Sequence, residues 1–88
     1  MASAYTRERR SLLQDLAEAL PRHGLAGRIV GGDDPMLQVW HPETGRQTLV
    51  FATPSREGWL FLWAQGGRGD ADDLERTAHE LKETLDSA

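Results

Sequence analysis

The chain has 88 residues, no cysteine and a formal net charge of −4, with ten Lys and Arg against fourteen Asp and Glu. This length supports one domain over residues 1–88, and the lack of cysteine excludes disulfides, thiol catalysis and thiolate metal sites. The acidic balance argues against nucleic-acid binding, and because no apolar run approaches the roughly 20 residues of a membrane span, we expect a cytoplasmic protein without membrane contact.

The first predicted element is an amphipathic helix that begins at about Ser3 or Thr6 and ends near Leu20. Apolar residues recur in it at three- and four-residue steps and form one stripe of Tyr5, Leu12, Leu13, Leu16 and Leu20. Pro21 cannot donate a backbone hydrogen bond, and Gly24 suits the left-handed position that follows many helices. The helix is therefore expected to end at this point.

Four short runs rich in β-branched and aromatic residues follow. They cover residues 25–30, 36–41, 46–53 and 59–65. The segments between them, GGDDP, PETG and PSREG, consist of turn-forming residues and are short enough for hairpins. The runs therefore predict a four-stranded antiparallel meander, in which the strand registers are left open.

A second helix is predicted from Asp70 to about Asp86. Its apolar stripe consists of Leu74, Ala78, Leu81 and Leu85. Asp70 suits the N-cap, since its carboxylate can accept a backbone N–H of the first turn. The predicted fold is α+β, in the order α-β-β-β-β-α, with both helices on one face of the sheet.

The fourth predicted strand is apolar on both sides. Alternation places Trp59, Phe61 and Trp63 on one side. This aromatic side buries more area and is expected to face the helices. The other side then forms a contiguous apolar patch on an uncovered sheet, which usually marks an interface. The predicted interface residues are Val50 from the third strand with Leu60 and Leu62 from the fourth.

The segment GGRGD before the second helix resembles a phosphate cradle, because a helix N-terminus attracts anions. Asp70, Asp72 and Asp73 would repel an anion there, and the spacing matches no nucleotide-binding motif. The three histidines, His23, His41 and His79, lack the spacing of a helix-borne zinc site. No serine stands in a G-x-S-x-G elbow. We therefore predict no enzyme activity, no metal and no cofactor.

The run GWLFLWAQGGRGDADDLERTAHEL, together with HGLAGRIV after the first helix, resembles a group of short uncharacterised actinobacterial proteins. The resemblance spans nearly the whole chain, at Gly24, Leu25, Gly58, Trp59, Phe61, Trp63, Gly66, Ala71, Asp72, Asp73 and Leu74. Gln65 departs from the pattern, which tends to have an aromatic residue there. The resemblance implies a shared fold and a small regulatory or adaptor partner, and it implies no assigned activity.

The leading hypothesis is a non-catalytic module that forms a homodimer or binds another protein through its open sheet face. An alternative is a small-ligand-binding domain with a pocket between the first helix and the sheet, lined by Trp40, Trp59 or Trp63. A third hypothesis, a nucleic-acid contact, would use the arginines of the first 30 residues, which are Arg7, Arg9, Arg10, Arg22 and Arg28. We rank this one last among the three because of the acidic composition.

Overall fold

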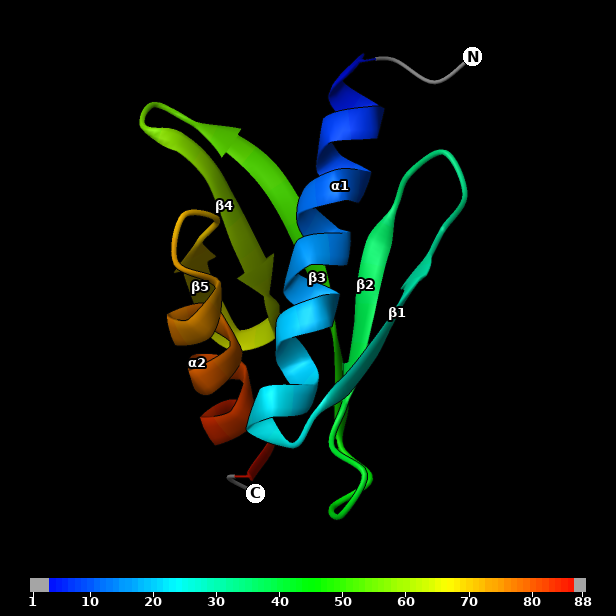
Figure 1. The fold of residues 1–88 in the computed structure, drawn as a ribbon, viewed down its shortest axis with the longest axis vertical. Coiled ribbons are helices and arrows are strands. Elements are labelled where there is room, and N and C mark those ends of the chain that lie inside the picture. The colour runs from blue at the N-terminus through cyan, green and yellow to red at the C-terminus, as the bar shows by residue number, and fades with distance from the viewer. Residues whose placement is uncertain (1–3, 87–88) are drawn as a thin grey trace.

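The computed structural model describes residues 4–86, which form one α+β unit around an antiparallel sheet (Figure 1). The elements, in chain order, are α1 (Ala4–Ala19), the 3-10 turn η1 (Leu20–His23), β1 (Ala26–Val30), β2 (Met36–Trp40), β3 (Gln47–Ser55), β4 (Gly58–Trp63), the turn η2 (Ala64–Gly66), β5 (Gly67–Asp70) and α2 (Leu74–Asp86). The predicted class is confirmed, but the sheet has five strands and not four.

The strands follow the order β1-β2-β3-β4-β5, and every neighbouring pair is antiparallel. The long strand β3 pairs with β2 through residues 47–50 and with β4 through residues 51–55. The two hairpins therefore diverge, and the sheet bends around α1, while α2 lies beside β5 (Figure 1). Both helices cover the same face, as the sequence predicts.

The apolar stripe of α1 forms the centre of the core. Leu13, Leu16 and Leu20 are fully buried. The helix begins at Ala4 in the described part of the chain, and the alternative start at Ser3 lies outside it. Gly24 has a φ of 75° and donates its N–H to the carbonyl of Pro21 at 3.1 Å. The predicted left-handed glycine at the end of the helical segment is thus confirmed.

The prediction that the second helix opens at Asp70 is wrong. Residues 67–70 instead form β5, because the turn at η2 reverses the chain so that they pair with β4. The helix begins at Leu74, and its N-cap is Asp73, whose Oδ1 accepts the N–H of Arg76 at 3.1 Å. A methyl group on Gly69 would lie 2.3 Å from Thr77 Oγ1, so the glycine permits α2 to pack directly on this strand.

The two faces of β4 are as predicted. Phe61 is fully buried and Trp63 is 7 % exposed, and both point toward the helices, as does the half-buried Trp59. Leu60 and Leu62 point away from the helices. The aromatic residues lie on the covered face because they remove more apolar area from water than the leucines do.

The predicted position of Val50 on the open face is wrong, since this residue is fully buried beneath the helices. The register explains the difference. Phe51 pairs with Leu62 and Ala52 pairs with Phe61, and residues directly opposite each other share a face. Val50 therefore joins Ala52 on the covered face, and Phe51 joins Leu62 on the open face.

The face assignment predicts unequal effects of one substitution at two phenylalanines. Phe61→Ala should lower the free energy of unfolding by about 3–5 kcal/mol, because it leaves a cavity in a closed core. Phe51→Ala, the matched control on the open face, should cost much less, because Phe51 is 46 % exposed. Urea unfolding followed by circular dichroism measures both values. Equal losses in the two variants would contradict the assignment.

Candidate interaction face

The open face of the sheet carries large apolar side chains at its centre. Leu49, Phe51 and Leu62 are 41, 46 and 38 % exposed. Phe51 and Leu62 are direct cross-strand partners, and Leu49 lies two residues before Phe51 on β3. We call these three residues, with the half-buried Leu60, the open-face patch. Apolar side chains that gather on an uncovered sheet face form a candidate interaction surface.

Polar side chains on the same face are already bonded to one another. Arg28 on β1 donates its Nε–H to Gln38 Oε1 at 3.4 Å, and Gln38 Nε2 donates to Gln47 Oε1 at 2.6 Å. Gln38 lies directly opposite Leu49, so this chain of bonds runs beside the patch. Covering these groups would cost less than covering unpaired ones, because their hydrogen bonds survive the removal of water.

Two of the three predicted interface residues lie on this face. Leu60 and Leu62 are there, Val50 is not, and Leu49 and Phe51 were missed. Predicting Leu49 and Phe51 would have required the position of the turn between β3 and β4. This turn has two residues, 56 and 57, and it pairs Ser55 with Gly58, which fixes the register of the two strands. Without that register, the alternation in β3 leaves the choice of face open.

The three tryptophans of the alternative hypothesis do not line a common pocket. Trp40 lies opposite Ala26 and Gln47 on the open face. Trp59 lies against the N-terminal part of α1, where its Nε1–H donates to Glu8 Oε1 at 3.0 Å. Its ring also meets Tyr5 edge-on at a centroid distance of 5.4 Å. Trp63 lies beneath Gly67 at the start of β5. The structure therefore does not bring the three tryptophans together, and an aromatic pocket between α1 and the sheet stays a prediction.

The arginines of the nucleic-acid hypothesis mostly bond to groups of the protein itself. Arg9 pairs with Asp34 at 3.5 Å, and Arg10 donates to the carbonyl of Gly32 at 2.6 Å. Arg28 bonds to Gln38, as described above, and Arg22 bonds to α2. These side chains hold neighbouring elements in place and do not form a common cationic surface.

An exposed ionic cluster joins the end of η1 to the first turn of α2. Arg22 forms a two-pronged contact with the Glu75 carboxylate, and His23 Nε2 lies 3.1 Å from Glu75 Oε1. The hydrogen bonds from Arg22 and His23 favour the ionised carboxylate and lower the pKa of Glu75 to about 2. Glu75 in turn raises the pKa of Arg22 above its ordinary value. The cluster fixes the two helical segments to each other.

His41 connects two elements of the fold through hydrogen bonds. Its ring is buried, and its Nδ1 accepts the backbone N–H groups of Glu43 and Thr44 at 3.1 and 3.3 Å. Its Nε2–H is therefore free to donate to Asp86 Oδ1, which lies 2.7 Å away. Hydrogen bonds from Lys82, and then from His41, lower the pKa of Asp86. The histidine thus attaches the β2–β3 turn to the end of α2.

Within residues 4–86 no three His, Asp or Glu side chains gather as a metal site would require. Neither helix of this part is long and apolar enough to cross a membrane. Comparisons with protein-family models, curated proteins and solved structures return no significant match. The resemblance to short actinobacterial proteins therefore stays a prediction.

The ionic cluster predicts a pH-dependent stability. Because the pKa of Glu75 is lowered from 4.5 to about 2 on folding, its contribution is present above pH 4.5 and is lost as the pH falls toward 2. Glu75→Gln should therefore lower the unfolding free energy at pH 7, and the difference from wild type should shrink between pH 4.5 and 2. Urea unfolding across this range measures it. A difference that does not change with pH, or an equal one in the control Glu80→Gln, would contradict the role of the cluster.

Proposed function

We propose that this protein is a non-catalytic interaction module that forms a homodimer through the open-face patch. The observation that carries the proposal is the presence of three large apolar side chains, 38–46 % exposed, side by side on the uncovered face of the sheet. Covering such side chains removes apolar area from water, which is the main favourable contribution to association.

A second copy of the chain is the occupant that this surface fits best. A two-fold interface places the same patch on both sides, so the patch must complement itself. The centre of the open-face patch consists of Leu49, Phe51 and Leu62, without a charged residue among them. Charged residues of this face, such as Arg28 and Arg68, lie on the edge strands β1 and β5. An apolar centre with a polar rim is the usual anatomy of a homodimer interface.

The proposal places the protein in the cytoplasm, which its cysteine-free composition fits. It assigns the molecule no substrate and no cofactor. The dimer would present two copies of each remaining surface, which are the helical layer and the two sheet edges. This role agrees with the adaptor-like role that the resemblance implies.

The proposal predicts that Leu62→Glu weakens self-association and leaves the fold intact. A carboxylate at position 62 would lose contact with water in the apolar centre of the interface, and the cross-strand Arg68 offsets this cost only in part. The dissociation constant should therefore rise at least about tenfold, since a 1.4 kcal/mol penalty has that effect. Sedimentation velocity over a wide concentration range measures the constant, and circular dichroism reports the fold.

Tyr5→Glu is the matched control, because Tyr5 is also a large exposed apolar residue, at 54 %, but it lies at the beginning of α1. It should leave self-association unchanged. A wild-type protein that stays monomeric at millimolar concentration would contradict the proposal. Unfolding by Leu62→Glu as severe as that caused by Phe61→Ala would contradict the face assignment on which the proposal is built.

A further inference from the structure

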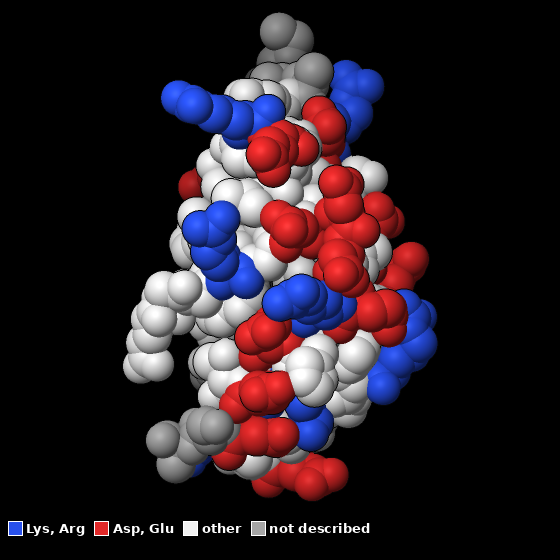
Figure 2. Space-filling model, turned by 90° about the vertical axis from the view of Figure 1, so that its left-hand side faces the viewer, with Lys and Arg blue, Asp and Glu red and all other residues white. Residues whose placement is uncertain are grey.

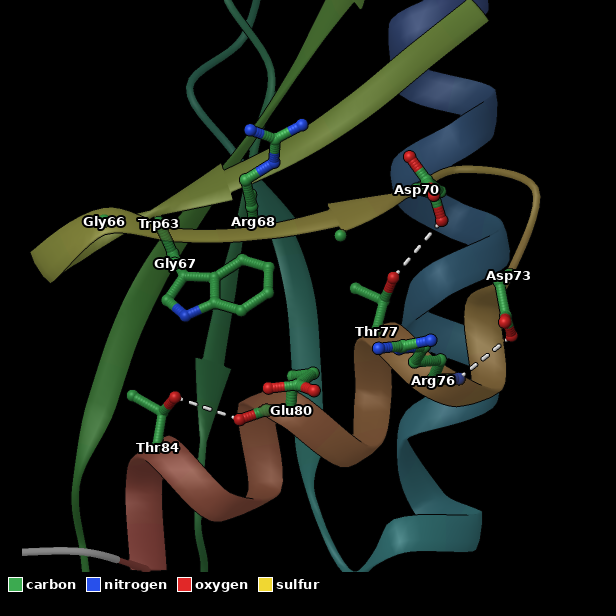
Figure 3. Close-up of a pocket in the computed structure, with 11 residues that line it drawn as sticks. Trp63, Gly66, Gly67, Arg68, Asp70, Asp73, Arg76, Thr77, Glu80 and Thr84 are labelled. Atoms are coloured by element: carbon green, nitrogen blue, oxygen red, sulfur yellow. Dashed lines mark hydrogen bonds between the residues drawn. The ribbon is translucent and has the colours of Figure 1, made fainter.

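A groove of about 490 Å³ runs between β5 and α2 (Figure 3). One wall is the last strand of the sheet, from Gly67 to Asp70. The other wall is one side of α2, where residues at helical spacing face the groove: Asp73, Arg76, Thr77, Glu80 and Thr84. The indole of Trp63 lies between the two walls (Figure 3).

The free edge of β5 presents unpaired backbone groups to this groove. The N–H of Ala71 donates to the carbonyl of Trp59 at 3.0 Å, which makes these two residues a hydrogen-bonded pair. Bonded and non-bonded pairs alternate along an antiparallel ladder. Arg68, opposite Leu62, is therefore in a non-bonded pair, and its N–H and C=O point away from β4.

The same edge is closed at its far end. The carbonyl of Asp70 accepts the N–H of Asp73 at 3.1 Å and the hydroxyl of Thr77 at 3.2 Å. An added strand could therefore bond to both the N–H and the C=O of Arg68. It could not continue past Asp70, whose carbonyl is already bonded. An extended peptide backbone can use both groups of one residue in this way.

Trp63 gives a second and independent indication of a ligand. The residue is 7 % exposed, its Nε1 atom is buried, and among the described residues its Nε1–H has no hydrogen-bond partner. A buried donor without an acceptor is costly. Gly67 lies on the ring, since a methyl group there would be 1.9 Å from Nε1. Because Nε1 is covered, a peptide carbonyl accepts its hydrogen only if the backbone at Gly67 shifts.

The charge around the groove selects the kind of strand. Residues 70–86 carry seven acidic side chains and two basic ones. The side of the molecule on which β5 and α2 lie accordingly shows far more acidic than basic surface (Figure 2). Within the groove lining itself, three acidic residues, Asp70, Asp73 and Glu80, stand against two basic ones, Arg68 and Arg76. A cationic segment is attracted to such a surface, and an anionic one is repelled.

We propose that an extended peptide segment rich in lysine or arginine binds in this groove as a sixth strand of the sheet. The peptide backbone would pair with the N–H and C=O of Arg68, and a peptide carbonyl would accept the Trp63 indole N–H. Its basic side chains would lie beside Asp73 and Glu80. The site uses other residues than the open-face patch does, so the two proposals can fail separately.

The probe for this site is a ten-residue peptide of alternating valine and lysine, blocked at both ends and titrated into ¹⁵N-labelled protein. The proposal predicts that the backbone amide of Arg68 and the indole resonance of Trp63 shift on binding. The indole resonances of Trp40, on the open face, and of Trp59, which already donates to Glu8, should not move. Shifts centred on Trp40 would overturn the proposal and place the peptide on the open face.

Two altered peptides test the two parts of the proposal. Two versions of this peptide carry methylated backbone nitrogens at every second residue, one at the odd and one at the even positions. Only one of the two versions should lose binding, because strand pairing needs the N–H groups on one side of the peptide. A peptide of alternating valine and glutamate should not bind. Equal binding by both methylated peptides would show that no sixth strand forms, and binding by the acidic peptide would overturn the choice of a cationic partner.

Charge reversal on α2 supplies matched variants of the protein. Glu80→Lys, in the groove, should weaken binding of the valine–lysine peptide about tenfold, whereas Glu83→Lys, outside the groove lining, should change it little. Phe51→Glu, which should break self-association, should bind the peptide as the wild type does. If the two charge reversals weakened binding equally, the peptide would be held by the general negative charge of the protein. That result would contradict a binding site in the groove.

Discussion

Both helices pack on one face of a single sheet, and this one-sided packing determines the rest of the structure. The leucines of α1 and α2 meet Val50, Ala52 and Phe61 in a closed core. A second layer of helices does not exist in residues 4–86, so the apolar residues on the other side of β3 and β4 keep contact with water. Burial on one face and exposure on the other follow from the same alternation of side chains along each strand.

The position of α2 depends on β5, which the helix covers through the contact between Thr77 and Gly69. This strand widens the sheet so that it can accommodate a second helix beside α1. It also creates a free edge bordered by the acidic side of α2. The fold therefore has two chemically different surfaces, an apolar sheet face and a polar groove at a sheet edge.

The elements with strong periodicity were predictable from the sequence. The leucine spacing of α1 and the glycine at position 24 defined the first helix, and the turn segments separated β1 to β4. The strand β5 was missed because GRGD has no β-branched or aromatic residue, and its strand conformation comes from pairing with β4. Leu60 and Leu62 were placed on the correct face. Val50 was placed on the wrong face and Phe51 was not identified, because the face of each residue in β3 depends on the register that the two-residue turn sets.

The central claim is that two copies meet through the sheet face that the helices leave uncovered. Its most direct test is an isotope-filtered nuclear Overhauser experiment on an equimolar mixture of ¹³C-labelled and unlabelled protein. The account predicts intermolecular contacts from the side chains of Leu49, Phe51 and Leu62, and none from the buried Phe61. Intermolecular contacts confined to α1, α2 or the sheet edges, or none at concentrations where the protein is dimeric, would contradict it.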